Sequence, residues 1–353
     1  MATLEVRSLQ KDFPVRNGVR RTLFPAVKGV DFELDAGRTV ALVGQSGSGK
    51  STVARMIAQL EKPTGGEILL NGQPATFRRR GMREYRSQVQ MVFQDPFASL
   101  NPFHTIAHHL ERPLLRNGRV RGKAALRARV EELLERVNLT PADNFAERRP
   151  HELSGGQRQR VAIARALAPE PTVLIADEPV SMLDVSIRLG ILHLLARLQR
   201  EENLAVLYIT HDLATARHFS DEILVMYQGE VVERGAADDV ILRPTAEFTR
   251  RLANAAPEPA RSERFRRAAV RYASGGDGGA GAGAGAGAAS GEGASASGEG
   301  ASAFGGGVSA FGGDASGAGA VPSATPDGSG TSDASGSPDT PDTSDGPDGA
   351  GKP

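Results

Sequence analysis

Short apolar runs and helical repeats alternate along the first 257 residues. Val40 to Val43 form a continuous apolar run, and a glycine-rich segment separates it from an apolar-periodic stretch at 53–60. The same order of strand and helix returns at 173–176 and 185–202, and a further apolar run lies at 204–209. Short continuous apolar runs bounded by turn residues are typical of buried strands. Strands that alternate with helices predict an α/β fold with a mostly parallel sheet.

Other apolar segments predict an additional, antiparallel β part. We expect strands at 4–8 and 27–34, with Gly18 and the basic pair Arg20-Arg21 in the turn between them. A further strand is expected at 67–70, because it is followed by the turn pair Asn71-Gly72.

A helical insertion is expected between a strand at 90–93 and the buried strand at 173–176. We place this helical subdomain at about 95–168. Within it, apolar residues at helical spacing share one face, with charged residues between them: Leu126, Val130, Leu133, Leu134 and Val137. The basic stretch 76–88 lacks such periodicity and predicts a solvated loop. Residues 223–234 predict a hairpin that turns at Gln228-Gly229.

The composition divides the chain into three parts. Residues 1–257 carry the periodic segments, 258–273 form a basic linker, and 274–353 consist mainly of Gly, Ala, Ser, Asp, Pro and Thr. The last part has too few large apolar residues to offset its ordering entropy, so we expect a disordered tail. The 42 basic and 42 acidic residues balance over the whole chain, but the tail holds ten acids and a single base. The remainder is therefore mildly basic, which suits a nucleotide or an anionic surface.

Cysteine is absent, which excludes disulfides and thiolate metal sites. The N-terminus lacks the pattern of a signal peptide, and we find no apolar run long enough to span a membrane. We therefore expect a soluble chain whose membrane association depends on a partner. The charge permits nucleic-acid binding but does not indicate it.

A phosphate-binding loop follows the apolar run at 40–43. The pattern G-x-x-x-x-G-K-[ST] covers Gly44, Gln45, Ser46, Gly47, Ser48, Gly49, Lys50, Ser51 and Thr52. Its setting between a strand and a helix is the one that this motif requires. Glycines let backbone N–H groups face phosphate oxygens, and the following helix N-terminus adds partial positive charge. Lys50 would contact the β- and γ-phosphates of ATP, and Ser51 would ligate Mg²⁺.

Four further positions supply side chains for phosphoryl chemistry. Asp177 ends a buried strand, where its carboxylate can hold Mg²⁺, and Glu178 beside it can polarise an attacking water. Gln94 follows another strand and could contact both Mg²⁺ and that water. His211 follows a third strand and could contact the γ-phosphate, whereas alone it would more often be structural. Each assignment depends on the phosphate loop.

The segment Leu153-Ser154-Gly155-Gly156-Gln157 indicates the family. With the phosphate loop, Gln94, 173–178 and His211, it resembles the ATP-binding subunits of ABC transporters over about residues 4–257. That resemblance implies a P-loop NTPase core of the ABC type. It also implies a head-to-tail dimer in which Ser154, Gly155, Gly156, Gln157 and Asp184 of one subunit contact ATP held by the other. Phe13 occupies the position of an aromatic residue that stacks on adenine.

Three segments resemble the oligopeptide/dipeptide importer subgroup more closely: 91–102, 150–160 and 248–257. This resemblance implies a peripheral subunit at the cytoplasmic face of the cell membrane. Its partners would be a second ABC ATPase subunit (a related chain or a second copy), two membrane permease subunits and, indirectly, an external solute-binding protein. Members of the subgroup also import oligosaccharides or nickel complexes, so the solute stays open.

Two other classes of protein remain as alternatives. A soluble ABC-type ATPase acting on ribosomes or DNA usually carries two cassettes or a long coiled-coil insertion, and neither is visible. A non-catalytic regulatory subunit tends to lose the glutamate or the 153–157 motif, and both are present. Among His104, His108 and His109, two lie at i, i+4 and could bind a metal on a helix, but no carboxylate or third ligand is obviously paired with them.

Overall fold

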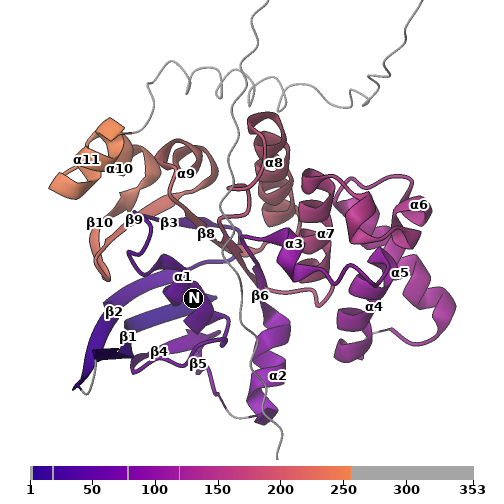
Figure 1. The fold of residues 1–353 in the computed structure, drawn as a ribbon, viewed down its shortest axis with the longest axis horizontal. Coiled ribbons are helices and arrows are strands. Elements are labelled where there is room, and N and C mark those ends of the chain that lie inside the picture. Colours follow the sequence, from indigo (N-terminus) through magenta and orange to yellow (C-terminus); the bar gives the residue numbers. More distant parts are fainter. Residues whose placement is uncertain (1–2, 18–19, 78, 119, 256–353) are drawn as a thin grey trace, which may run out of the picture. The chain divides into compact units, whose positions relative to one another are not determined.

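The computed structural model describes residues 3–17, 20–77, 79–118 and 120–255 (Figure 1). The predicted basic linker and disordered tail therefore lie outside the described residues. No helix within the described ranges is long and apolar enough to cross a membrane.

The larger sheet confirms the predicted mostly parallel core. Its strand order is β10-β9-β3-β8-β7-β6, and every neighbouring pair is parallel except β9 and β10. The predicted 223–234 hairpin is this antiparallel edge. The strands are β3 (Thr39–Val43), β6 (Val89–Val92), β7 (Val173–Asp177), β8 (Ala205–Thr210), β9 (Glu222–Tyr227) and β10 (Glu230–Ala236).

The smaller sheet is the predicted antiparallel part, in the order β2-β1-β4-β5. It comprises β1 (Leu4–Asn17), β2 (Arg20–Leu34), β4 (Gly65–Leu70) and β5 (Gln73–Pro74). The predicted strands at 4–8 and 27–34 were too short, and Arg20-Arg21 lie in β2 rather than in the turn. Register shifts after Val6 and between Lys11 and Asp12 break the period of two that marks a strand.

The helix α1 (Lys50–Ile57) lies between the two sheets (Figure 1). Its apolar residues share a core with Val40 and Leu42 of β3 and with Leu4 and Val6 of β1. The intervening residues of β3, Ala41 and Val43, belong to a second core on the other face of the sheet. Both faces of β3 are therefore buried, which explains its unbroken apolar sequence.

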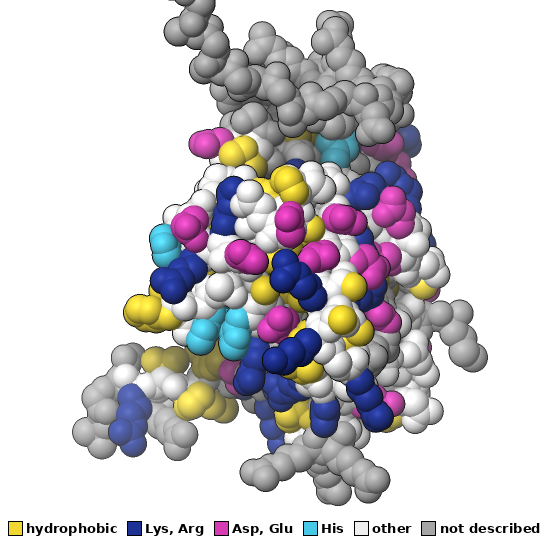
Figure 2. All heavy atoms as spheres, turned by 90° about the vertical axis from the view of Figure 1, so that its right-hand side faces the viewer, with side chains coloured by type: hydrophobic (Ala, Val, Ile, Leu, Met, Phe, Trp, Pro, Cys, Tyr) yellow, Lys and Arg dark blue, Asp and Glu magenta, His cyan; other side chains and the backbone are white. Residues whose placement is uncertain are grey.

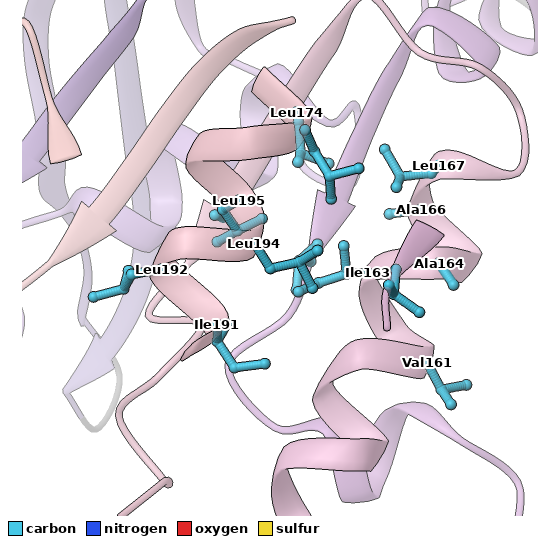
Figure 3. Packing of buried hydrophobic residues seen from close by; sticks show 14 of the residues in the cluster. Val161, Ile163, Ala164, Ala166, Leu167, Leu174, Ile191, Leu192, Leu194 and Leu195 are labelled. Carbon is cyan, nitrogen blue, oxygen red and sulfur yellow. The ribbon is translucent and has the colours of Figure 1, made fainter. Parts of the chain in front are cut away.

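The second core joins the parallel sheet to the helical part. Its helices are α3 (Pro96–Ser99), α4 (Ile106–Asn117), α5 (Lys123–Arg136), α6 (Ala142–Glu147), α7 (Gly155–Leu167), α8 (Val185–Glu201) and the short η1 (Pro150–Glu152). Figure 3 shows apolar side chains of α7 and α8 packing beside Leu174 of β7. The residues predicted to share a face of α5 are all buried, which confirms the helical insertion.

One segment predicted as a loop is a helix, α2 (Arg79–Gln88). Tyr85 anchors it, because this side chain is buried and its hydroxyl donates to the Ile57 carbonyl at 2.8 Å. Arg86 donates to the carbonyl of Gln59 at 2.6 Å. Contacts with the end of α1 therefore hold a helix that has almost no apolar repeat.

The described chain ends with α9 (Leu213–Phe219), α10 (Ala237–Leu242) and α11 (Glu247–Ala255). Phe248 of α11 stacks on Tyr227 of β9, with ring centroids 4.2 Å apart. Glu233 accepts hydrogen bonds from the backbone N–H groups of Thr245 and Ala246, at 2.7 and 3.1 Å. A carboxylate at this position satisfies donors that precede the helix.

We expect acid to release α11 before the rest of the fold. Burial opposes ionisation of Glu233, but hydrogen bonds from Thr245, Thr249 and Ala246 together lower its pKa below the ordinary value of 4.5. A lowered pKa in the folded state contributes stability above the unfolded-state pKa and loses it as pH falls through the folded value. The protection factor of 247–255 against hydrogen exchange, which corrects for the intrinsic pH dependence of exchange, should therefore fall below about pH 4.5. Glu233→Gln should remove this pH response, and Glu230→Gln should retain it.

Candidate active site

The predicted chemical residues meet at one edge of the larger sheet. Because β3, β8, β7 and β6 are parallel neighbours, their carboxyl ends lie side by side. The phosphate loop follows β3, His211 follows β8, Asp177 ends β7 with Glu178 directly after it, and Gln94 follows β6. Ligands in open α/β sheets bind at this edge.

Backbone geometry of the phosphate loop requires its glycines. Gly47 and Gly49 have φ angles of 80° and 106°, in the left-handed region that side chains disfavour. A Cβ atom on Gly44 would lie 2.2 Å from the carbonyl oxygen of Met226. The Ser48 hydroxyl is buried and has no hydrogen-bond partner among the described residues. A loop of this shape with an unsatisfied hydroxyl fits an anionic ligand.

Lys50 points back into the loop instead of toward solvent. Its Nζ donates to the carbonyl oxygens of Gly44 and Gln45, at 2.7 and 2.9 Å. Burial lowers the pKa of Lys50, and attraction from Glu178 and Asp177 opposes that shift. A buried ammonium that donates to neutral carbonyls can exchange these hydrogen bonds for bonds to phosphate oxygens, which carry negative charge.

Ser51 and Asp177 form an oxygen pair beside the loop. The Ser51 hydroxyl donates to a carboxylate oxygen of Asp177 at 3.2 Å. Burial raises the pKa of Asp177, and the hydrogen bond from Ser51 opposes this shift. Hydroxyl and carboxylate oxygens are the ligands that Mg²⁺ prefers. A bound cation would remove the cost of burying this carboxylate, so the donor set fits Mg²⁺.

Glu178 lies between the two other predicted catalytic side chains. Gln94 Nε2 donates to one oxygen of its carboxylate at 2.9 Å, and His211 Nδ1 lies 3.4 Å from the other. The backbone of Glu178 has a φ of 45°, and its N–H donates to the Ile209 carbonyl at 2.9 Å. A non-glycine residue in this conformation costs about 1–2 kcal/mol. The fold thus holds the Glu178 side chain in place despite local strain.

The 153–157 motif forms the beginning of α7. Ser154 caps this helix and accepts from the N–H of Gln157 at 3.3 Å, while the Gln157 side chain accepts from the N–H of Ser154 at 2.9 Å. Among the described residues, neither hydrogen-bonds to the phosphate loop. Asp184 stands at the N-cap position of α8 but its side chain makes no capping hydrogen bond. The contact of these residues with ATP therefore stays a prediction.

Two glycines near this motif should respond to alanine in opposite ways. A Cβ on Gly156 would lie 2.6 Å from Cγ2 of Ile187, a side chain that is stiff at χ1. Gly156→Ala should therefore destabilise the fold by about 1–3 kcal/mol. At Gly190, inside α8, the nearest atom is the end of the Arg160 side chain at 3.5 Å, so Gly190→Ala should stabilise by about 0.5–1 kcal/mol. Urea unfolding of both variants measures the difference.

Phe13 lies on β1 of the smaller sheet, and the phosphate loop follows a strand of the larger sheet. The side chain is half-buried, and the ammonium of Lys11 lies 5.0 Å from the centroid of its ring. Its register partner on β2 is Phe24. None of these contacts tests whether Phe13 stacks on adenine, so this role stays a prediction.

The sequence analysis missed a basic cleft that begins at the predicted Mg²⁺ ligands. The cleft has a volume of about 1300 Å³ and extends from Ser51, Asp177 and Gln94 to α2, α4 and α7. Six arginines line it: Arg55, Arg83, Arg86, Arg112, Arg116 and Arg165. The basic run at 78–86 was a signal for part of this surface, but it was interpreted as a solvated loop.

The fold and this site define a nucleotide-binding protein of the phosphate-loop class. A family model described as ABC transporter matches residues 27–181. The chain belongs to the ABC transporter family of ATP-binding proteins, as its relatives also show. This confirms the family resemblance of the motifs.

Two curated relatives are named for peptide-type import. The oligopeptide transport ATP-binding protein AppF of Bacillus subtilis is 44% identical over 262 residues, which cover 72% of this chain and 78% of AppF. The glutathione import ATP-binding protein GsiA of Escherichia coli K12 is 47% identical over 264 residues, which cover 73% of this chain. The chain spans only 42% of the length of GsiA.

Solved structures confirm the fold. CbiO1 of Clostridium perfringens, part of the ABC transporter complex cbiONQ, matches with a TM-score of 0.60 and 28% identity, covering 75% of this chain and 99% of CbiO1. The ATP-binding cassette MJ0796, solved as a dimer with ADP and Pi, matches with a TM-score of 0.58 and 33% identity. That match covers 66% of this chain and 98% of MJ0796.

Proposed function

We propose that this chain hydrolyses ATP and thereby energises an importer of oligopeptides or dipeptides. The observation that carries the proposal is the position of Glu178, held between Gln94 and His211 at the sheet edge that also bears the phosphate loop. A carboxylate at this place can accept a proton from a water that attacks the γ-phosphate. The likeness to AppF and GsiA supports a peptide as the solute.

Each part of the site has a role in this proposal. Backbone N–H groups of the loop and the ammonium of Lys50 bind the phosphates. Ser51, Asp177 and Gln94 would hold Mg²⁺, which supplies positive charge for the β- and γ-phosphates. His211 contacts the γ-phosphate while Glu178 orients the water.

A second subunit completes the site. The described chain has a single phosphate loop and a single 153–157 motif, and the hydrogen bonds of Ser154 and Gln157 are made within that motif. We therefore infer that Ser154, Gly155, Gly156, Gln157 and Asp184 contact ATP across a dimer interface. The likeness to MJ0796, which was solved as a dimer, supports a dimer for this chain. The second subunit is a related chain or another copy, and two permease subunits bind the dimer at the cytoplasmic face of the membrane.

Co-purification from native membranes tests this function. The tagged chain, extracted in mild detergent, should bring two multi-span permeases and a solute-binding protein, whose ligand can then be measured directly. If the solute-binding protein binds a peptide, the proposal is supported. If it binds an oligosaccharide or a nickel complex, the transport role stands and the proposed solute is wrong. Recovery of ribosomal or DNA-processing proteins without a permease would contradict the transport role.

A further inference from the structure

Three buried hydroxyl groups lie where β8 meets α9. They belong to Tyr208 and Thr210 of β8 and to Thr215 of α9, whose exposed fractions are 2%, 4% and 5%. The Tyr208 hydroxyl lies 3.2 Å from that of Thr215 and also bonds with that of Thr210. We call these three residues the hydroxyl cluster. The proposed function gives them no role.

The hydroxyl cluster binds the backbone of Asp212, the residue directly after His211. The Thr215 hydroxyl donates to the Asp212 carbonyl at 3.0 Å. A hydroxyl has a single hydrogen, so Thr215 must accept from Tyr208. The Thr210 hydroxyl accepts from the N–H of Asp212 at 3.0 Å. Both backbone polar groups of Asp212 are therefore bonded to the cluster.

Further hydrogen bonds hold the chain on either side of His211. The Asp212 side chain caps α9 by accepting from the N–H of Ala214 at 2.9 Å. Two residues before His211, the Ile209 carbonyl accepts from the N–H of Glu178 at 2.9 Å. The backbone around His211 is thus fixed both to the cluster and to the residue proposed as the general base.

The imidazole of His211 receives less support from packing than other histidines do. It is 60% exposed, and its Nδ1 lies 3.4 Å from the Glu178 carboxylate. On the helical part, by contrast, the rings of His104 and His108 stack with centroids 4.1 Å apart, and Figure 2 shows histidine side chains side by side. Within the described ranges, no group of three or more His, Cys, Asp or Glu residues is placed to hold a metal ion. The position of His211 therefore depends mainly on its backbone.

The chemistry of the cluster suits a fixed support. Burial raises the pKa of Tyr208 to about 12, and hydrogen bonds with Thr215 and Thr210 oppose this shift. The phenol is therefore neutral near pH 7 and keeps the hydrogen that it donates. A buried hydroxyl that loses its partner is costly, so the cluster resists rearrangement.

We propose that the hydroxyl cluster positions His211 for ATP hydrolysis. Tyr208 and Thr215 hold Asp212, and this keeps the neighbouring imidazole within reach of both Glu178 and the γ-phosphate. The inference rests on the proposed function, because that function gives His211 its contact with the γ-phosphate. It adds Tyr208 and Thr215 as positioning residues, which act through Asp212 rather than by touching ATP.

Two buried tyrosines allow a matched comparison. Tyr208→Phe removes the hydroxyl that leads to His211, whereas Tyr85→Phe removes one that donates to the Ile57 carbonyl at 2.8 Å. The exposed fractions are 2% for Tyr208 and 5% for Tyr85, and burial raises the pKa of both. Each variant loses one buried hydrogen bond, so both should lose stability. Only Tyr208→Phe should affect His211.

NMR of the full chain with labelled histidines tests the position of His211 without nucleotide. Its imidazole signal is assigned by its loss in His211→Gln. The signal should shift or broaden in Tyr208→Phe and in Thr215→Val, which removes the second hydroxyl. It should stay unchanged in Tyr85→Phe and in Thr215→Ser, which keeps that hydroxyl. The signals of the stacked histidines should stay unchanged in every variant.

Steady-state ATP hydrolysis by the same chains measures the consequence. Tyr208→Phe and Thr215→Val should lower kcat by about 10- to 100-fold, the size of effect expected for a catalytic group displaced by about 1 Å. The KM for ATP should change by less than about twofold, because the phosphate loop supplies most of the binding. Tyr85→Phe and Thr215→Ser should keep the parent kcat. The double variant Tyr208→Phe/Thr215→Val should be no slower than Thr215→Val, because both residues belong to one chain of hydrogen bonds.

The outcomes separate the inference from the proposed function. A parent-like His211 signal and kcat in Tyr208→Phe and Thr215→Val would overturn the inference and leave the ATPase role intact. Equal losses of kcat in Tyr208→Phe and Tyr85→Phe would also contradict it, because general destabilisation would then explain both. If the parent chain hydrolyses no ATP with Mg²⁺, the proposed function fails, and the inference fails with it.

Discussion

Lys50→Ala is expected to weaken ATP binding by about 100-fold and to remove measurable ATP turnover. The ammonium of Lys50 lies inside the phosphate loop, where it donates to the carbonyls of Gly44 and Gln45. Loss of a buried charged contact costs about 3 kcal/mol, which is the stated change in affinity. Turnover falls further because the same charge stabilises the transition state. Equilibrium binding of a fluorescent ATP analogue and phosphate release measure the two effects.

A second lysine provides the matched control. Lys28 pairs with Glu230 at 3.2 Å on the protein surface, outside the site. Lys28→Ala should therefore leave ATP affinity and turnover unchanged. Unchanged ATP affinity in Lys50→Ala, with the fold intact, would contradict the role of the loop.

Glu178→Gln should keep ATP affinity but lower turnover by about 100- to 10,000-fold, which is the usual contribution of a positioned general base. The amide has the size of the carboxylate and can keep its contact with Gln94, so the fold should not change. Without hydrolysis the ATP-bound dimer cannot reopen. Light scattering should detect a lasting dimer with ATP and Mg²⁺, and monomers with ADP.

Asp177→Asn distinguishes the two neighbouring acids. Asp177 faces Ser51 at the predicted Mg²⁺ site, so this variant should lose the Mg²⁺ dependence of ATP binding and should not accumulate as a dimer. Normal turnover in Glu178→Gln would exclude Glu178 as the base. A trapped dimer in Asp177→Asn would make Asp177 the general base and Glu178 the Mg²⁺ ligand.

Much of the fold could be predicted because apolar spacing and phosphate-loop chemistry are local. The unbroken apolar runs around Leu42 and Leu174 predicted strands whose two faces are both buried, and the structure confirms them. The buried face of α5, which includes Leu133, could likewise be predicted from apolar residues at helical spacing. The loop from Gly44 to Thr52 was identifiable because a strand and a helix flank it in the sequence.

The parts that could not be predicted depend on contacts between distant residues. Tyr85 and Arg86 hold α2 through single hydrogen bonds to carbonyls after α1 and at its end, so the sequence of α2 shows no apolar repeat. The bulges near Ser8 and Asp12 shift the face on which side chains lie, which hid the length of the β1–β2 hairpin. The position of Gln94 and His211 on either side of Glu178 requires the strand order β8-β7-β6, which no single segment encodes.

Because the backbone at Glu178 is left-handed, the residue that would make the protein most stable at this position differs from the glutamate that catalysis requires. Glycine and asparagine adopt this conformation more readily than glutamate does. A library randomised at this codon and sorted only for resistance to heat should enrich Gly and Asn. The same library sorted for growth that depends on transport should return Glu, although the resulting protein melts earlier.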